Sequence, residues 1–208
     1  EEIALFVEEC FLNKSKEIPL YGLVLAGGYS KRMQQEKALL AYNGKAQVEQ
    51  CLDLLSELCE KSFVSKRDSQ DLGANKFPVI TDRFLDFGPL GGILSAMTSI
   101  PHAAWLIVAC DLPLMTVDVL KNLIENRDPF KMATAYMNAD NTFPEPLCAI
   151  YEPKAVLRLF DSLALGKRCP KKILANSSIK RLALPFKDAL MNVNTPEEYS
   201  QLQEEIWV

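Results

Sequence analysis

The amino-acid sequence predicts an α/β fold, a three-layer, doubly wound and mostly parallel sheet. Two observations carry this prediction. Short apolar runs suited to strands alternate with longer segments whose apolar residues recur at helical spacing. Residues 104–109 (AWLIVA) are apolar without alternation, which is typical of a parallel strand covered on both faces.

The predicted elements follow from these patterns in chain order. Apolar runs predict strands at residues 21–26, 62–65, 77–81, 104–109, 131–137, 147–151, 179–184 and 190–193. Helical spacing predicts helices at residues 3–13, 46–60, 93–100, 117–124, 156–163 and 196–206. Turn or cap residues precede two of these helices, glycines at 88–92 and Thr116.

The composition is that of an ordinary globular domain. The chain has 208 residues, of which 49% are hydrophobic and 24% charged, and its net charge of −4 argues against nucleic acid as a partner. The longest apolar run, residues 103–110, is far short of the ~20 residues that cross a bilayer, and there is no signal-peptide pattern. We expect a cytoplasmic protein that does not bind membranes. Residues 20–208 are the predicted domain, and residues 1–19 are an N-terminal helical extension, either the end of an upstream domain or a packing element.

A glycine loop ends the first predicted strand. Gly27 and Gly28 allow the backbone to approach a phosphate with its N–H groups, and Arg32 and Lys37 add positive charge a few residues later. A triphosphate carries about four negative charges at neutral pH, which this loop suits. The other interpretation is an ordinary strand-to-helix turn with solvated basic residues. We favour phosphate binding, although the loop matches neither G-x-G-x-x-G nor the P-loop pattern.

Two aspartates follow other strands at the same predicted edge of the sheet. Asp111 comes directly after the run 104–110, so its carboxylate is expected to face the crevice where α/β proteins bind ligands. Mg²⁺ prefers one or two such carboxylates together with phosphate oxygens and water; the alternative is an Asp that caps the following turn. Asp82 follows the strand 77–81 and is expected to contact a ribose or the waters of the metal. The glycine turn at 88–92 either approaches the ligand or packs on the sheet.

Catalysis by a Ser–His–Asp set is not expected. The single histidine, His102, lies beside Pro101 in a predicted loop, and none of the six cysteines forms a C-x-x-C pair that would favour a zinc site. We interpret the cysteines as reduced thiols of a reducing compartment. A nucleophile that is already anionic, such as a phosphate, needs no base, so positioning and charge neutralisation can catalyse its reaction.

Several motifs, in order, resemble the MobA-like nucleotidyltransferases, and among these most closely the molybdenum cofactor guanylyltransferases. They are LAGGYSKRM at 25–33, EKALL at 36–40, NGK at 43–45, GPLGGI at 88–93, ACDLP at 109–113, EPLCAIY at 145–151 and MNVNTPEE at 191–198. The resemblance covers about residues 20–205 and implies a Rossmann-like nucleotidyltransferase fold. It also implies transfer of GMP from GTP to molybdopterin with release of pyrophosphate, Mg²⁺ as cofactor, and molybdoenzymes or their chaperones as candidate partners.

By position, the resemblance implies roles for residues of this chain. The implied nucleotide-binding residues are Leu25, Ala26, Gly27, Gly28, Lys37, Ser65, Asp82 and Asp111. The implied catalytic residues are Arg32, Lys37 and Asp111. The implied metal ligands are Asp111 and Asn194, with Asn192 near the metal or the acceptor.

The chain also departs from the family pattern. Gln34-Gln35 stand where the family usually has Gly, and Ser65 stands where Asn is common. Two alternatives therefore stay open: a relative that uses CTP or a sugar phosphate, and a nucleotide-binding regulatory module without turnover. A basic segment, residues 166–172, either receives the phosphate of the pterin acceptor or is a solvated helix start.

Overall fold

The computed structural model describes residues 17–26, 41–42, 45–67, 77–112, 114–186 and 188–191, together with Ile3, Phe6, Val7, Glu9, Asn13 and Lys14. The strands are β1 (Leu20–Leu25), β2 (Ala41–Tyr42), β3 (Lys45–Ala46), β4 (Lys61–Lys66), β5 (Val79–Thr81), β6 (Ala104–Ala109), β7 (Ala133–Met137), β8 (Pro144–Tyr151) and β9 (Ile179–Leu182). The helices are α2 (Gln47–Leu58), α3 (Pro89–Ser99), α4 (Val117–Glu125), α5 (Ala155–Ala164) and α6 (Pro170–Ala175).

A seven-stranded sheet with the order β5-β4-β1-β6-β8-β7-β9 forms the centre of the fold. Within it β8 runs antiparallel to β6 and β7, whereas the other neighbouring strands are parallel. This confirms the predicted mostly parallel sheet. The chain passes from β1 outward to β4 and β5 and then returns to β6 on the other side of β1. Ligands of doubly wound proteins bind beyond the carboxyl ends of the strands at such a reversal.

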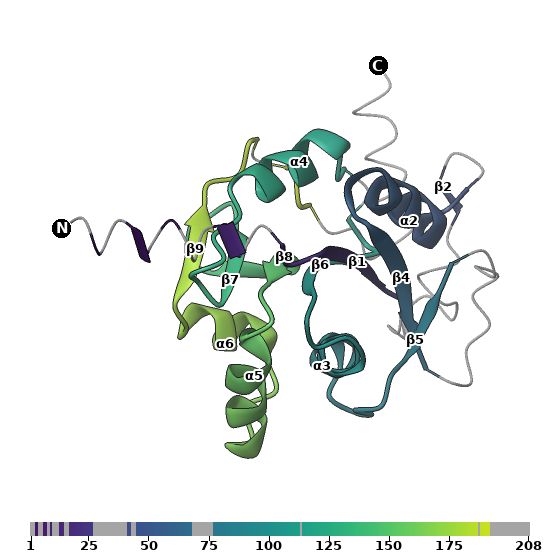
Figure 1. Cartoon of the computed structure of the whole chain (residues 1–208). Helices are drawn as coiled ribbons and strands as arrows, with labels where there is room; N and C mark the ends of the chain where they lie inside the picture. Colours follow the sequence, from purple (N-terminus) through teal and green to yellow (C-terminus); the bar gives the residue numbers. More distant parts are fainter. Residues whose placement is uncertain are drawn as a thin grey trace.

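Helices cover both faces of this sheet (Figure 1). On one face α2 and α4 bury apolar side chains that include Leu52 and Leu120. On the other face α3, α5 and α6 bury a second cluster, which includes Ile93 and Leu159. All of β6 is buried between the two layers, as its unalternating sequence predicts.

Most of the predicted boundaries that fall on described residues are confirmed within a few positions. Thr116 caps α4, because its Oγ1 accepts a hydrogen bond from the N–H of Val119 at 3.4 Å. The predicted turn at 88–92 is wrong, since α3 already begins at Pro89. Proline suits the first helical position, where its missing N–H costs no hydrogen bond.

Other differences concern short elements and the chain ends. Leu190 and Met191 lie outside the strands, because the N–H of Met191 closes a turn onto the carbonyl of Asp188 at 2.9 Å; this part of the predicted strand 190–193 is wrong. The β2–β3 ribbon was not predicted, since strands of two residues leave no periodic pattern. The predicted helix at 196–206 and much of the one at 3–13 lie outside the described residues. Within the part of the chain that is described, no helix has the length and apolar character to cross a membrane.

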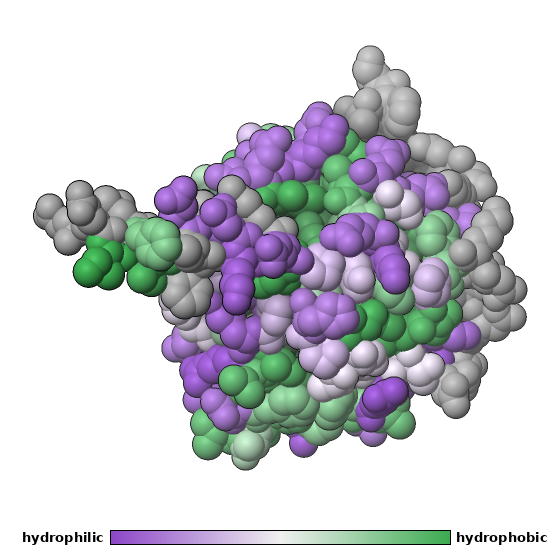
Figure 2. All heavy atoms as spheres, in the orientation of Figure 1, coloured by the Kyte–Doolittle hydropathy of each residue, from purple (hydrophilic) through white to green (hydrophobic). Residues whose placement is uncertain are grey.

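The surface differs between the two helical layers. Figure 2 shows hydrophilic residues over α4, at the top of the view, and hydrophobic residues gathered lower down, around α3 and α5. Leu157 on α5 and Leu165 directly after it are 69% and 68% exposed. The layer formed by α3 and α5 therefore has the more apolar exterior in this view.

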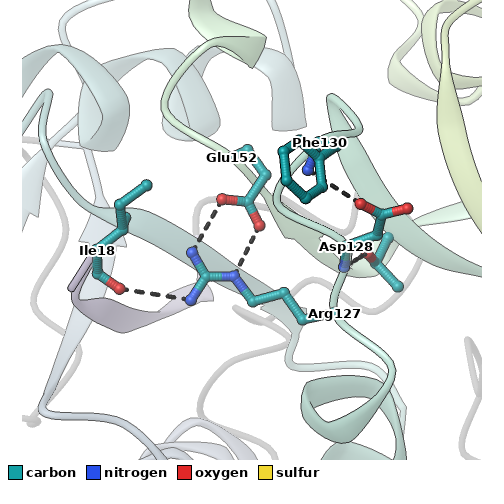
Figure 3. Close-up of polar contacts among 6 residues, drawn as sticks. Ile18, Arg127, Asp128, Phe130 and Glu152 are labelled. Atoms are coloured by element: carbon teal, nitrogen blue, oxygen red, sulfur yellow. Dashed lines mark hydrogen bonds and ion pairs between the residues drawn. The ribbon is translucent and has the colours of Figure 1, made fainter. Parts of the chain in front are cut away.

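An ion pair links three chain segments at the edge of the sheet where β1 begins (Figure 3). Arg127 donates to the two carboxylate oxygens of Glu152 at 2.7 and 2.9 Å and to the carbonyl of Ile18 at 3.4 Å. The Glu152 side chain is 1% exposed. A bidentate guanidinium–carboxylate pair compensates a buried charge well, so this contact ties the start of β1 to the end of β8.

Candidate active site at the carboxyl edge

The carboxyl ends of β1, β4, β5 and β6 meet at one edge of the sheet, where a cavity of about 150 Å³ opens beside α3. The lining combines apolar and polar side chains: Leu25, Ser65, Arg67, Asp82, Phe84, Leu85, Asp86, Gly88, Pro89, Gly92, Ala109 and Leu147. Apolar walls with a few convergent polar groups are typical of a small-molecule site. Three predicted nucleotide-binding residues, Leu25, Ser65 and Asp82, are brought together here.

Ser65 and Asp82 form a hydrogen-bonded pair in this cavity. Ser65 Oγ donates to Asp82 Oδ1, and the N–H of Asp82 donates to the carbonyl of Lys66 at 2.9 Å. Burial raises the pKa of the Asp82 carboxyl, while the Ser65 hydrogen bond and the charge of Arg67 lower it in part. The cavity therefore holds a desolvated acceptor close to a cation.

Helix α3 orients the backbone next to Asp82. The fully buried Ser95 accepts a hydrogen bond from the N–H of Arg83 at 2.8 Å. Its own hydroxyl donates to the carbonyl of Gly91 at 2.7 Å. The residue that follows Asp82 is thus fixed to the first turn of the helix, and the carboxylate is held by rigid elements rather than by a free loop.

Two glycines allow α3 to lie this close to the sheet. A Cβ atom at Gly91 would lie 2.1 Å from the carbonyl oxygen of Phe84, and one at Gly92 would lie 2.6 Å from Ser65 Oγ. The contact at Gly91 is with backbone, which cannot move aside, whereas the contact at Gly92 is with a side chain that would have to rotate; both glycines therefore allow the close packing of helix on sheet. Gly92 also lines the cavity, so it contributes to the site as well.

Asp111 lies two residues beyond the end of β6, at the same edge. β6 pairs with β1 so that Ala109 lies opposite Leu25, which places Asp111 just beyond the end of the strand that leads into the glycine loop. Its side chain is partly buried, and its charge acts on Glu145 of β8. Asp111 thus stands between the nucleotide-side strands and β8.

The glycine loop itself lies outside the described residues, as do Gly27, Gly28, Arg32, Lys37, Asn192 and Asn194. Their roles stay predictions. Ala26, which precedes the loop, is 1% exposed, and its N–H donates to the carbonyl of Ser65 at 3.2 Å. Ala26, the last described residue before the loop, therefore lies next to the cavity-lining Ser65.

Sequence reasoning missed Glu145 as a site residue. Because β8 is antiparallel, its first residues reach the edge where the parallel strands end. Burial raises the pKa of the Glu145 carboxyl and the charge of Asp111 adds to the increase, while a 3.0 Å hydrogen bond from the N–H of Leu147 and the charge of Lys171 lower it. The position of Glu145 between two prolines, ahead of an apolar run, could have singled it out. The sequence pattern does not predict, however, whether the strand runs parallel or antiparallel.

The carboxylates present fit one mode of Mg²⁺ binding. Over the described ranges, no group of three or more His, Cys, Asp or Glu side chains could hold a metal ion by itself. Mg²⁺ commonly takes one or two protein carboxylates and completes its shell with phosphate oxygens and water. Asp111, at the carboxyl end of the central strand, suits such a shared site.

A larger cavity, about 660 Å³, lies at the opposite edge of the sheet and is lined in part by Pro19, His102, Pro129 and Phe130. No predicted site residue lines it. His102 is exposed in a turn, as predicted, and no disulfide joins the cysteines of the described ranges.

The strand order, the crevice and its polar groups define a doubly wound α/β protein of the nucleotide-binding kind. The model of the MobA-like NTP transferase domain matches residues 22–200. The chain therefore belongs to the MobA-like nucleotidyltransferases, which confirms the predicted family and enzyme class.

Three relatives illustrate the similarity. The molybdenum cofactor biosynthesis bifunctional protein of Synechocystis sp. is 39% identical over 188 residues, which cover 89% of this chain but only 54% of that protein. A probable molybdenum cofactor guanylyltransferase of Nostoc sp. is 29% identical over 193 residues, covering 89% of this chain and 91% of that protein. The crystal structure of molybdopterin-guanine dinucleotide biosynthesis protein A from Archaeoglobus fulgidus superposes with a TM-score of 0.74 at 23% identity, covering 89% of this chain and 97% of that one, and shows the same fold.

Proposed function

We propose that this protein transfers GMP from GTP to molybdopterin with release of pyrophosphate, in a reaction that depends on Mg²⁺. The observation that carries the proposal is the meeting of a cavity containing Ser65 and Asp82 with Asp111 at the carboxyl edge of the sheet. Relatives named as molybdenum cofactor guanylyltransferases support GTP as donor and molybdopterin as acceptor.

The cavity suits the base of the nucleotide. Its volume, about 150 Å³, accommodates a ring system but not a whole nucleotide, so the ribose and phosphates lie outside it, toward Asp111. Guanine offers N–H donors on one side and the acceptors O6 and N7 on the other. The Asp82 carboxylate matches the donors, and the Arg67 guanidinium matches the acceptors.

The chemistry then requires positioning more than proton transfer. The terminal phosphate of molybdopterin is already an anion, so it attacks the α-phosphate without a general base. When bound, Mg²⁺ would neutralise the developing charge, and Asp111 is the residue that would hold it. Gly27, Gly28, Arg32 and Lys37, from the family pattern, complete the phosphate cradle in this proposal.

The test is pyrophosphate release by the purified protein with Mg²⁺ and molybdopterin, measured with GTP and in parallel with CTP. Release with GTP, dependent on the pterin, is the expected result. Release with CTP alone would move the protein to a cytidylyl branch of the family. Binding of GTP with no release would contradict the proposal and favour a regulatory module.

A further inference from the structure

The structure separates the basic segment 166–172 into residues with different surroundings. Lys171, in the first turn of α6, has its Nζ 5.0 Å from the centre of the Phe143 ring. Arg168 lies over the ring of Phe87, in the loop that leads into α3, at 4.8 Å. Lys172, by contrast, is exposed. The segment is therefore more than a solvated helix start, and its residues are not equivalent.

Lys171 faces the start of β8 and, through it, the crevice. Phe143 precedes β8, and Glu145 is the second residue of that strand. The charge of Lys171 acts on Glu145, as does the charge of Asp111. Glu145 is itself fixed, since its Oε1 accepts the N–H of Leu147 at 3.0 Å. Asp111 and Lys171 thus both act electrostatically on Glu145, one raising and one lowering its pKa.

The charges at the carboxyl edge indicate a role for Lys171. A phosphate monoester at the attacking position brings about two negative charges to a region that already contains two carboxylates and the triphosphate of the donor. Repulsion at such short range is expensive, so the acceptor phosphate needs a cation on the side away from the donor. Lys171 is a cation on that side, with its ammonium group beside the Phe143 ring and its charge acting on the Glu145 carboxylate.

We propose that Lys171 binds the phosphate of the acceptor, and that Phe143 and Glu145 are positioning residues that hold the ammonium group at the crevice. The inference rests on the proposed function and specifies the acceptor side of its site. An ammonium group with three donors suits a terminal phosphate approached from one direction.

The test compares Lys171→Ala with Lys172→Ala, which removes the same charge one residue further along the helix. Molybdopterin binding is measured by its fluorescence in the presence of a non-hydrolysable GTP analogue, and KM and kcat are measured for GTP and for the pterin. Lys171→Ala is expected to weaken pterin binding and raise its KM by about tenfold with the KM for GTP unchanged. Lys172→Ala should match the wild type, and Lys171→Arg should restore most of the pterin affinity.

The role of Glu145 is tested by Glu145→Gln, which keeps the side-chain volume and removes the charge. It is expected to raise the KM for the pterin more than the KM for GTP. Equal pterin affinity in Lys171→Ala and the wild type, with normal turnover in both, would overturn the inference and leave the proposed function standing. Absence of turnover in the wild type contradicts the proposed function instead, and the binding measurement then still decides whether Lys171 is the phosphate ligand.

Discussion

The two edges of the sheet differ in how fully their buried carboxylates are compensated by positive charge. At the edge where β1 begins, the carboxylate of Glu152 is almost fully buried and accepts hydrogen bonds from two guanidinium nitrogens of Arg127. At the carboxyl edge, Asp82 and Glu145 are largely desolvated, and burial raises the pKa of each despite nearby donors and cations. A buried charge with a bidentate partner stabilises the fold. Carboxylates whose pKa stays raised by burial are typical of sites where a ligand supplies further compensating contacts.

Cavity size and strand topology point to opposite edges of the sheet. The cavity at the Glu152 edge is about 660 Å³ and the one at the carboxyl edge about 150 Å³. The smaller cavity has the ends of four neighbouring strands around it, and strand ends at a reversal of strand order are where α/β proteins gather their polar groups. Topology is therefore the better guide in this fold.

The largest expected effect belongs to Asp111→Asn at the carboxyl edge. In the proposed reaction Asp111 would hold Mg²⁺, so loss of its charge should lower kcat by about a thousandfold or more, because charge neutralisation would be the main catalytic contribution. Pyrophosphate release measures the rate, and thermal unfolding verifies that the fold is kept. A folded variant with the wild-type rate would remove Asp111 from the site.

At the other edge, Arg127→Met should change stability and leave catalysis alone. The substitution isolates the buried Glu152 carboxylate, which costs about 3 kcal/mol of unfolding free energy. Urea unfolding measures the loss, and KM values for GTP and the pterin should equal those of the wild type. The double variant Arg127→Met with Glu152→Met should recover part of the stability, and a change of KM in the single variant would break the contrast between the edges.

Gly92→Ala and Gly91→Ala sharpen the contrast within α3. At Gly92 the new methyl group meets the side chains of Ser65 and Leu25, which can rotate, so stability should change little. Rotation of Ser65 removes the hydrogen bond to Asp82, and the KM for GTP should therefore rise by about threefold to tenfold.

At Gly91 the methyl group meets the backbone oxygen of Phe84 at 2.1 Å, and the loss of stability should be about 2 kcal/mol. A Gly91→Ala variant as stable as the wild type would show that α3 can shift on the sheet.

The smallest expected effect is the pH dependence contributed by Asp82. Its raised pKa means that the folded protein keeps a proton over a range where the unfolded chain has released it. Stability contributed at this site therefore falls as the pH rises from the ordinary carboxyl pKa to the raised one. Asp82→Asn should have a higher melting temperature than the wild type near neutral pH, with the difference fading in acid. Asp140→Asn, which removes a carboxylate at an exposed position, serves as the matched control.

Much of this arrangement could be predicted from local sequence patterns. Strands such as 104–109 and caps such as Thr116 depend on neighbours in the chain, and both are confirmed. Asp82 and Asp111 follow apolar strands, so their place at one edge also followed from the parallel pattern. The start of α3 was mistaken for a turn because Gly91 and Gly92 are unfavourable inside an isolated helix; close contact with Phe84 and Ser65 overrides that preference.

The acceptor side could not be predicted in the same way. Glu145 reaches the crevice because β8 runs antiparallel, and nothing within residues 144–151 specifies direction. The contact of Lys171 with Phe143 joins residues that are far apart in the chain, and it depends on how α6 packs on β8. Such contacts depend on tertiary packing rather than on spacing.

The reversed direction of β8 also has a consequence for how the enzyme can diversify. All described residues that line the small cavity lie before residue 112 except Leu147, and the proposed acceptor side is formed by the later segment from Phe143 to Lys171. The proposed nucleotide and acceptor sides are thus drawn mainly from two different stretches of sequence. An exchange of the later stretch between relatives would alter the choice of acceptor while the machinery that reads the donor nucleotide stays intact.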